Sequence, residues 1–394
     1  MNFPDIKNDK VKKQKRLTVC YFGTYRSEYS RNRIMIKGLL KNEVNVIECH
    51  EKLWEGIEDR VNAVKYGLIN PKFWKRIITT YIRLFRKFKT IPVSNYDVIV
   101  VGYPGQFDVF FAKLFTLFIK KPIVWDVFMS IYLVAIERNL HRKNPFSVKL
   151  LKIIEYVAMR IPEKLIIDTE QYATWLNKQY SIPIDKFCLV PTGADDDIFF
   201  LEQFSEYVGN EKFKILYYGT FIPNHGVPYI VEAANLLTND PSIIFQFIGN
   251  GPEMNICLDL IEKFKLKNIE FYPWMGQEEL KNYIREADVI LGAFGKTPQS
   301  LMTIQNKIYE GMALGKCIIS GDSEAVRNIL KNKNEITLTD RNNPESLKEA
   351  ICLMKENSNL INQISRNAFL TFNRNYTISL NGLRMKNCLK NLTM

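Results

Sequence analysis

Short apolar runs alternate with amphipathic segments from one end of the chain to the other. In the first half, strand-like runs are expected at Leu17–Phe22, Val44–Cys49, Asp97–Gly102, Pro122–Asp126 and Lys164–Asp168. In the second half they are expected at Lys214–Tyr218, Ile243–Ile248, Asn268–Tyr272, Val289–Ala293, Cys317–Ser320 and Glu335–Leu338. Helical periodicity fills most of the intervals. Strands that alternate with helices predict parallel sheets covered on both faces, so we expect an α/β fold.

The length of the chain and one charge-rich break predict two domains. At 394 residues the chain is too long for a single ordinary core. We place a basic tail at residues 1–16, a first domain at 17–195, a hinge at 196–212 and a second domain at 213–376. Ligands of open α/β sheets bind outside the carboxyl ends of the strands. The site is therefore expected in a cleft across which the two parallel sheets face each other.

Composition and cysteine usage narrow the class of protein. A hydrophobic content of 46% with 24% charged residues indicates a globular protein. None of the seven cysteines forms a C-x-x-C pair or has a histidine at metal-binding spacing. We therefore expect small buried thiols in a reducing compartment, and no metal site. The N-terminal stretch is polar and basic without an apolar core, which indicates no secretory signal and a cytoplasmic protein.

The net charge of +12 is concentrated in one segment, residues 72–90, which contains no acidic residue. On a helix, Trp74 and the other apolar side chains of this segment fall on one side. The basic side chains on the opposite side include Lys72, Lys75, Arg76, Arg83, Arg86 and Lys87. A basic amphipathic helix with aromatic residues on its apolar face suits the surface of an anionic membrane. The alternative is a core-facing helix with a solvated basic back.

A second apolar segment, Phe107–Ile119, is interrupted by Asp108 and Lys113. It is too short to span a bilayer, which needs about 20 apolar residues. We expect a buried helix of the first domain that lies next to the membrane-facing side. The protein is therefore expected to be peripheral on the cytoplasmic face of the membrane.

Glycines and polar residues follow several of the predicted strands. A glycine at a strand end lets the backbone approach a ligand closely. The donor-binding candidates at these strand ends are Gly23, Thr24, Gly219, Thr220, Gly249, Gly251, Phe294 and Gly295. His225, which begins the next helix, is a candidate phosphate donor or else a turn histidine. Trp274 could form a wall against a flat base, although a core or surface aromatic explains it nearly as well.

The segment Gln305–Lys316 is the most informative part of the chain. It predicts a loop that enters a helix N-terminus, where unpaired amides and the helix dipole attract phosphate. Glu310, one turn inside that helix, could accept hydrogen bonds from a ribose diol. The residues expected around the phosphates are Thr303, Ile304, Gln305, Asn306 and Lys307. This pattern favours a nucleoside diphosphate sugar as ligand, and the alternative is an ordinary crossover helix with a solvated Glu310.

Taken in order, these motifs resemble the donor domain of retaining GT-B glycosyltransferases of the family 4 type. The matching segments are the glycine turn Ile215–Gly226, the G-x-G exit Gly249–Gly251, Glu278-Glu279, Ala287-Asp288 and the N-K-x-x-E-x-x-A-x-G-K run Asn306–Lys316. Weaker matches in the first half are Ile167–Thr169 and Val190–Asp195. The resemblance implies two Rossmann-like domains, with residues 377–394 crossing back as a helix onto the first.

The sequence also departs from the pattern of that family. The family has two glutamates eight positions apart, and Met302 occupies the first of these positions whereas Glu310 matches the second. Thr220 and His225 stand where the glycine turn usually carries arginine and lysine. These departures are typical of a divergent branch. As a result, Lys307 and the amides at the helix start have to neutralise more of the negative charge on the departing diphosphate.

The resemblance implies transfer of a sugar from a nucleoside diphosphate sugar to a saccharide acceptor, with retention of configuration, no cofactor and no compulsory metal. The candidate catalytic residues are Asp126, His225, Lys307 and Glu310. Asp126, at the end of a first-domain strand, is assigned to the acceptor side, although it could simply cap the next segment. The amphipathic helix predicted at residues 72–90, if it docks on a membrane, favours a lipid-linked acceptor.

Three other classes of protein remain open. Met302 and Thr220 favour a non-catalytic GT-B accessory subunit. A hydrolysing nucleotide-sugar epimerase shares the fold, but it should carry more ionisable residues in the cleft. A nucleic-acid binder is disfavoured because no recognised nucleic-acid module accompanies the positive charge.

Overall fold

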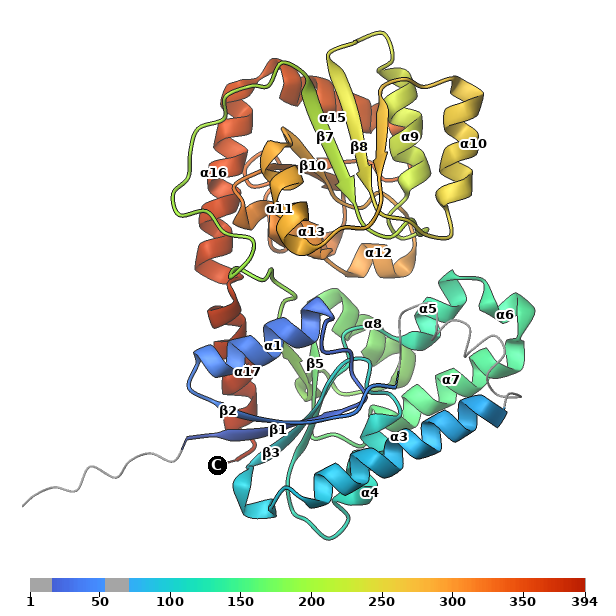
Figure 1. Ribbon diagram of the computed structural model, residues 1–394, viewed down its shortest axis with the longest axis vertical. Coiled ribbons are helices and arrows are strands. Elements are labelled where there is room, and N and C mark those ends of the chain that lie inside the picture. Colours follow the sequence, from blue (N-terminus) through green and yellow to red (C-terminus); the bar gives the residue numbers. More distant parts are fainter. Residues whose placement is uncertain (1–15, 54–70, 394) are drawn as a thin grey trace, which may run out of the picture.

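The computed structural model describes residues 16–53 and 71–393, which form two α/β domains, one above the other in Figure 1. The first domain contains a six-stranded sheet in the order β2-β1-β3-β4-β5-β6, in which every strand pairs in parallel with its neighbours. Its strands are β1 (Thr18–Gly23), β2 (Asn45–His50), β3 (Val98–Val101), β4 (Ile123–Asp126), β5 (Lys164–Ile167) and β6 (Phe187–Leu189). Apart from Arg16, the expected basic tail lies outside the described residues.

The second domain contains another six-stranded parallel sheet, in the order β12-β11-β10-β7-β8-β9. Its strands are β7 (Phe213–Tyr218), β8 (Ile243–Ile248), β9 (Ile269–Tyr272), β10 (Val289–Leu291), β11 (Cys317–Gly321) and β12 (Thr337–Thr339). The α/β fold of two domains with parallel sheets, expected from the sequence, is confirmed.

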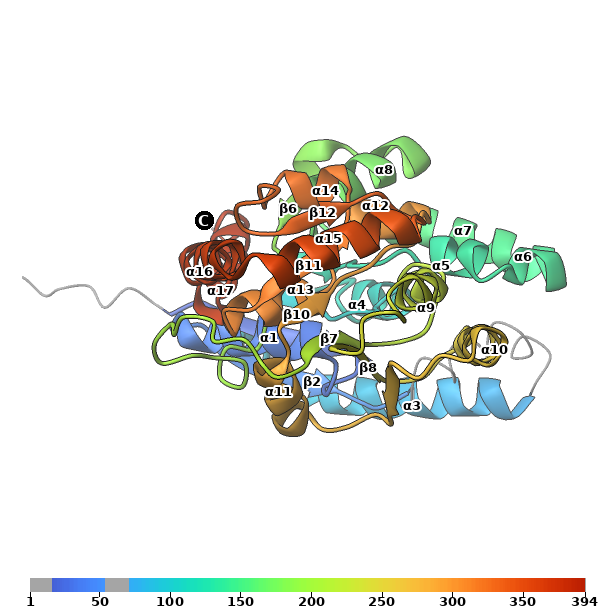
Figure 2. The same cartoon turned by 90° about the horizontal axis from the view of Figure 1, so that it is seen from above.

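Helices cover both faces of each sheet (Figures 1 and 2). In the first domain they are α1 (Ser30–Lys41) and α17 (Ile378–Lys390) on one face, and α3 (Pro71–Lys89), α4 (Asp108–Phe115), α7 (Pro145–Ala158) and α8 (Glu170–Tyr180) on the other. The short helices α5 (Ile131–Glu137) and α6 (Leu140–Lys143) precede α7. The helices of the second domain are α9 (Val227–Leu236), α10 (Met254–Phe264), α11 (Gln277–Glu286), α12 (Pro298–Met302), α13 (Asn306–Ala313), α14 (Glu324–Arg327), α15 (Pro344–Glu356) and α16 (Ser358–Asn375).

The last helix, α17, returns to the first domain and packs across α1. The two helices touch through glycines, because a Cβ atom built on Gly382 would lie 2.0 Å from the carbonyl oxygen of Gly38. Cys388 of α17 forms a disulfide with Cys188 of β6. The expectation that all cysteines are reduced thiols is therefore corrected for this pair. The other five cysteines are free.

The chain passes between the domains after β6 and again between α16 and α17 (Figure 1). The first crossing is held to the first domain by Asp195, whose carboxylate accepts hydrogen bonds from Arg33 Nε at 2.8 Å and Lys37 Nζ at 3.0 Å. The hinge predicted at 196–212 falls between the last strand of the first sheet and the first strand of the second. Both crossings lie on the same side of the molecule (Figure 1).

Candidate functional site

A cavity of about 480 Å³ lies between the two domains, at the carboxyl ends of the strands of both sheets. Its first-domain wall consists of Tyr29, Ser30, Tyr103, Phe128, Met129, Ile131, Val134, Ala135, Glu137, Arg138 and Leu140. Its second-domain wall consists of Tyr218, Gly219, Thr220, Ile222, Asn224, His225, Ile248, Trp274, Met275, Gln277, Leu280, Gln299, Thr303, Ile304, Gln305, Asn306, Lys307 and Glu310. The first wall is mainly apolar and aromatic, whereas the second carries most of the polar groups.

Glu310 projects from the second turn of α13 and lines the cavity. The Tyr218 hydroxyl, at the end of β7, donates a hydrogen bond to Glu310 Oε2 at 2.9 Å. Burial raises the pKa of the Glu310 carboxyl to about 7, although the Tyr218 hydroxyl and Lys307 oppose that shift. The carboxylate is thus held in place from one side and retains acceptor capacity toward the cavity.

Lys307 is buried one helical turn before Glu310, and its Nζ has no hydrogen-bond partner among the residues that the structure describes. The ammonium lies over the ring of Tyr217, 3.9 Å from the ring centroid. Burial lowers the pKa of Lys307 to about 7, partly offset by Glu310. A buried amine with unused donors at a cavity wall is suited to receive an anion.

His225 stands beside Lys307 on the loop between β7 and α9. Its Nδ1 lies 2.7 Å from the Thr220 carbonyl oxygen and 2.9 Å from the Tyr217 hydroxyl. Burial, together with the nearby Lys307 charge, lowers the pKa of His225 well below its usual value, so the ring is neutral. The Thr220 carbonyl oxygen can only accept, so the proton of the neutral ring lies on Nδ1 and Nε2 has no proton to donate, which favours the alternative of a turn histidine.

The N-terminus of α13 is the third polar feature of this wall. The N-cap residue Gln305 makes no side-chain capping bond, and its Oε1 has no hydrogen-bond partner within the described residues. Asn306 instead donates from its side chain to Ser30 Oγ of the first domain, 2.5 Å away. Thr303 and Ile304 complete the loop along the cavity wall. The first amides of this helix therefore face a concave polar site.

The strand-end glycines of the second domain differ in what they approach. Gly219 lines the cavity, with Lys307 Nζ 3.1 Å from the position of a Cβ atom. A Cβ atom on Gly249 would lie 2.3 Å from the Gly219 carbonyl oxygen, and one on Gly251 would lie 2.6 Å from the Phe221 amide nitrogen. Gly249 and Gly251 thus let two loops pack together and are not among the cavity-lining residues.

Trp274 and the Phe294–Gly295 pair were both expected next to the ligand. Trp274 lines the cavity and is 56% exposed, so its indole face is available for contact. Phe294 is buried in the second-domain core, and its amide donates to the His225 carbonyl oxygen. A Cβ atom on Gly295 would lie 1.9 Å from the Pro223 carbonyl oxygen. These two residues therefore support the loop that carries His225 and do not line the cavity.

The first-domain candidates lie away from the cavity. The Gly23-Thr24 turn closes on Asp108, whose Oδ2 accepts from the Thr24 amide at 2.8 Å and whose Oδ1 accepts from the Tyr81 hydroxyl at 2.6 Å. Asp126 is completely buried and receives two hydrogen bonds from Arg31, at 2.8 Å from Nε and 3.0 Å from Nη2. Its carboxylate is occupied by a structural ion pair, which leaves the acceptor-side assignment without geometric support.

Met302, at the position of the missing glutamate, belongs to the hydrophobic cluster of the first domain. The residue comes from α12 of the second domain, so its side chain crosses the domain boundary. Its carbonyl oxygen accepts a hydrogen bond from Thr169 Oγ1 at 2.5 Å. The position packs two domains together and is not among the residues that line the cavity.

Glu137 is a cavity residue that sequence reasoning missed. It ends α5 in the first domain, and its carboxylate reaches the second domain. Oε1 accepts from the Gln299 amide at 2.7 Å and Oε2 accepts from Asn224 Nδ2 at 3.0 Å. Burial raises the pKa of Glu137. The only local signal was an acidic residue at a helix end, which does not reveal a partner 162 residues away.

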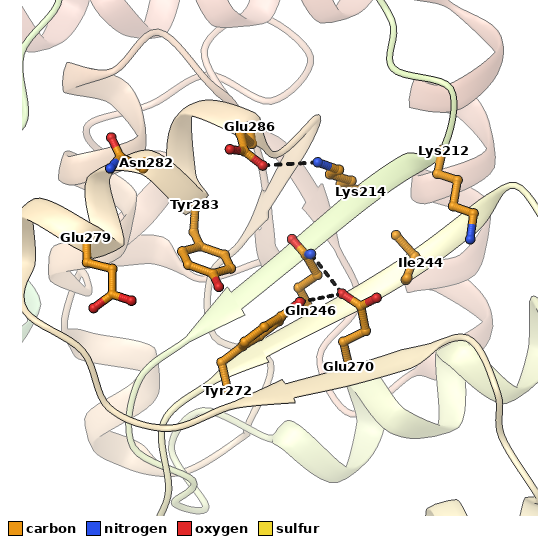
Figure 3. A pocket seen from close by; sticks show the side chains of 10 residues that line it. All are labelled: Lys212, Lys214, Ile244, Gln246, Glu270, Tyr272, Glu279, Asn282, Tyr283 and Glu286. Atoms are coloured by element: carbon orange, nitrogen blue, oxygen red, sulfur yellow. Dashed lines mark hydrogen bonds and ion pairs between the residues drawn. The ribbon is translucent and has the colours of Figure 1, made fainter.

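A second hollow lies on the second domain, over β7, β8 and β9 and beside α11 (Figure 3). Two of its charged groups form an ion pair, Lys214 with Glu286 at 3.1 Å, and Gln246 and Tyr272 both donate to Glu270. None of the residues expected to bind a ligand lines it. The interdomain cavity is therefore the candidate functional site.

Known proteins resemble this chain in part of its sequence and in its fold. Residues 200–371 match the family "Glycosyl transferases group 1". An uncharacterized glycosyltransferase of Methanocaldococcus jannaschii is 24% identical over 152 residues, which are 39% of this chain and 41% of that relative. The structure of Anabaena HepE in complex with UDP and glucose superposes with a TM-score of 0.68 at 11% identity, covering 96% of this chain and 100% of that chain. Sucrose-phosphate synthase from Thermosynechococcus elongatus gives a TM-score of 0.72 at 12% identity, covering 96% and 99%.

The two structural neighbours share the two-domain architecture over nearly the whole chain, which shows the GT-B fold. The family match covers most of the hinge and of the second domain, where Lys307 and Glu310 lie. The neighbours thus show the fold of the whole chain, whereas the similarity to glycosyltransferases in sequence is confined to less than half of it.

Proposed function

We propose that the protein transfers a sugar from a nucleoside diphosphate sugar to a saccharide acceptor with retention of configuration, as in the family 4 type. One observation carries the proposal. Within the interdomain cavity, the buried Lys307 and Glu310 lie one turn apart on a helix whose N-cap residue makes no side-chain capping bond. This combination offers a cation and free amides to a diphosphate, and a carboxylate to a ribose.

The residues on the donor side have different chemical roles. Glu310 accepts from the ribose diol, and Lys307 with the first amides of α13 holds the diphosphate. These fixed donors stabilise the charge that develops as the bond between the anomeric carbon and the phosphate oxygen breaks. The acceptor oxygen bonds to the same carbon from the same face, and its proton passes to a diphosphate oxygen. The proposal requires no cofactor and no metal ion.

The first-domain wall is the proposed acceptor side. Tyr29, Tyr103 and Phe128 form an aromatic cluster there, with ring centroids 5.1–6.3 Å apart. Aromatic faces suit the apolar faces of sugar rings, and the apolar residues of α5 extend this wall. An acceptor with a saccharide head and a lipid tail fits these surfaces. We therefore propose a lipid-linked saccharide and a peripheral position on the cytoplasmic membrane face.

A thermal-shift screen over UDP-, GDP- and ADP-sugars tests the donor assignment, because a ligand of the folded state raises the melting temperature. HepE was solved with UDP, so uridine nucleotides come first. Glu310→Ala should weaken donor binding by about tenfold to a hundredfold, the effect of a lost hydrogen bond to a charged group. Glu349→Ala, which removes an exposed carboxylate from α15, is the matched control. Unchanged donor affinity in Glu310→Ala would refute the assignment.

A non-catalytic accessory subunit is the second candidate, because Met302 fills the first glutamate position with an apolar side chain. Such a subunit would bind the nucleotide sugar but would neither transfer nor hydrolyse it. Product analysis with the tightest-binding donor separates the two functions. Release of the nucleoside diphosphate in the presence of a saccharide acceptor would identify an enzyme.

A further inference from the structure

The hollow over β7, β8 and β9 lies where the parallel sheet of the second domain lacks a helical cover (Figure 3). Helix α11 lies beside β7 on this face, and β8 and β9 extend past it (Figure 3). The opposite face of the same strands carries Phe245, Phe247 and Phe271, which pack in the second-domain core with residues of α9 and α10. Strands of a parallel sheet are usually covered on both faces, so the open face is an exception within this fold.

Polar residues occupy the open face where the opposite face is aromatic. Lys214 of β7, Gln246 of β8 and Glu270 of β9 line the hollow, and Gln246 stands beside Glu270 in the register of the two strands. Successive side chains of a strand point to opposite faces, so Gln246 and Glu270 alternate with the phenylalanines of the core. A helix packed over these polar groups would bury them at a cost in free energy. The sequence therefore keeps this face open to solvent or to a ligand.

Glu270 is the charged group that the hollow holds in a fixed orientation. Its Oε2 accepts a hydrogen bond from Gln246 Nε2 at 2.9 Å and another from the Tyr272 hydroxyl at 2.7 Å. No hydrogen bond within residues 16–53 and 71–393 reaches Oε1, and neither dashed line to Glu270 in Figure 3 ends on that atom. The bonds from Gln246 and Tyr272 lower the pKa of Glu270, so the carboxylate is charged at neutral pH. One acceptor oxygen thus remains unused.

Two tyrosines give the hollow an aromatic side. The rings of Tyr272 and Tyr283 have centroids 4.9 Å apart and planes inclined at 60°. Tyr283 extends from α11 toward the strands (Figure 3), and both side chains are only partly buried. Such rings pack against the C–H faces of sugars, whose hydroxyls need polar partners at the edge of the ring. The hollow offers an aromatic surface and a fixed acceptor side by side.

The charges of the hollow nearly cancel, which narrows the class of ligand. Two lysines, Lys212 and Lys214, face three carboxylates, and Lys214 is paired with Glu286. A phosphate or another anion would meet the excess of carboxylates. A metal ion is disfavoured as well, because the part of the chain that the structure describes contains no group of three or more side chains suited to hold one. A neutral ligand with several hydroxyl groups fits these surroundings.

We propose that this hollow binds a neutral oligosaccharide, at a site separate from the interdomain cavity. Neighbouring hydroxyls of one sugar ring donate to Glu270 Oε1 and accept from Lys212, whose charge acts on Glu270, while the ring packs against Tyr283. The volume of about 480 Å³ is within the range of about 300–1,000 Å³ that small-molecule sites occupy. Helix α11 separates the two sites, since its Gln277 and Leu280 line the interdomain cavity. None of the described residues lines both, so the proposal does not depend on sugar transfer.

An array of neutral oligosaccharides, probed with the full-length protein, tests the proposal. At least one oligosaccharide should bind, and calorimetry with that oligosaccharide then compares variants. Glu270→Gln keeps the shape of the side chain but loses its charge, and should weaken binding about tenfold. Glu262→Gln removes an exposed carboxylate from α10 and is the matched control. Lys212→Gln should weaken binding about threefold, with the exposed Lys267→Gln as its control.

Two further measurements separate this site from the interdomain cavity. Glu270→Gln should leave the affinity for a nucleotide sugar unchanged, and Lys307→Ala should leave oligosaccharide binding unchanged. Failure of the donor assignment would therefore not affect this result. Absence of binding to every oligosaccharide on the array would overturn the proposal. So would binding that Glu270→Gln and Lys212→Gln both leave at the wild-type level, because the oligosaccharide would then lie elsewhere on the protein.

Discussion

At the scale of residues, the candidate site depends on two buried charges whose pKa values are displaced toward each other. Lys307 and Glu310 both have a pKa of about 7, the first lowered and the second raised by burial. Each favours the charged form of the other. The two groups therefore titrate as a coupled pair. A bound diphosphate would add a negative charge beside Lys307 and favour its protonated form.

This coupling predicts a bell-shaped pH dependence of donor affinity with a maximum near pH 7. Below that pH, Glu310 gains a proton and loses acceptor capacity toward the ribose. Above it, Lys307 loses its charge toward the diphosphate. Isothermal titration calorimetry with a nucleotide sugar across pH 5.5–9, a range set by these two pKa values, measures the profile. Glu310→Gln should flatten the acid limb and Lys307→Arg the alkaline limb. A flat profile in the unmodified protein would contradict the roles of both residues.

Met302 allows a second prediction about a single residue. Met302→Glu recreates the paired glutamates of the family but places a carboxyl group in an apolar cluster. We expect a loss of roughly 2 kcal/mol or more in the free energy of unfolding, because the buried group lacks a partner. Urea unfolding measures this loss, and Met302→Leu, which conserves volume, is the control. Increased donor affinity without a loss of stability would show that position 302 turns into the cavity.

The residues that the sequence identified fall into two groups for a physical reason. Those around α13 line the cavity, because a helix N-terminus at the end of a parallel sheet creates its own polar surface. Asp126 and Thr24 also follow strands, but a partner from elsewhere in the chain satisfies each of them. Arg31 is 95 residues away from Asp126, and Asp108 is 84 residues away from Thr24. Local pattern contains no information about such partners.

At the scale of elements, the strands were predictable and the connections between domains less so. Long apolar runs such as β8 (Ile243–Ile248) can be recognised as strands from the sequence alone. The edge strand β6 has only three residues and two half-buried side chains, so its pattern is weak. The packing of α3 was only partly predictable, because one stripe of its apolar face is buried and the adjoining stripe is exposed. Periodicity shows that a face is apolar but does not show how much of it a neighbouring helix covers.

The crossing of α1 and α17 carries a prediction about stability. Gly382→Ala places a methyl group 2.0 Å from the backbone oxygen of Gly38, so the two helices must separate. We expect a loss of about 1–3 kcal/mol, which thermal unfolding monitored by circular dichroism would detect. Gly209→Ala is the control, because the nearest atom to its Cβ position is the Tyr207 hydroxyl at 3.5 Å. An unchanged melting temperature in Gly382→Ala would show that the helices do not touch there.

At the scale of the molecule, the two domains meet through a few specific contacts. Glu137 and Met302 connect them at α12, and Asn306 with Ser30 connects them beside α13. A site formed between domains requires that they stay at one spacing while a donor and an acceptor are both bound. The two hydrogen bonds to Glu137 are charge-assisted, so each is stronger than a hydrogen bond between neutral groups.

Removal of the Glu137 carboxylate should affect acceptor use more than donor binding. Glu137→Ala breaks both hydrogen bonds between α5 and the second domain, whereas Lys307 and Glu310 stay in place. We expect donor affinity within about threefold of wild type and transfer to a saccharide acceptor reduced by at least about tenfold. Calorimetry and product analysis measure the two quantities, and Glu137→Gln, which keeps an acceptor oxygen, should recover part of the transfer. Equal losses in both measurements would contradict a bridging role.

The chain crosses between the domains twice, and both crossings lie on one side of the molecule (Figure 1). Two connections on the same side restrict twisting of one domain against the other. The easiest motion that remains is a hinge rotation about the line that joins the two connections. Helices α5 and α12 lie away from both crossings (Figure 1), where a small rotation produces a larger displacement than it does beside the connections. The hydrogen bond from the Gln299 amide to Glu137 thus acts away from the two connections, so this carboxylate can control how far apart the two domains stand around the cavity.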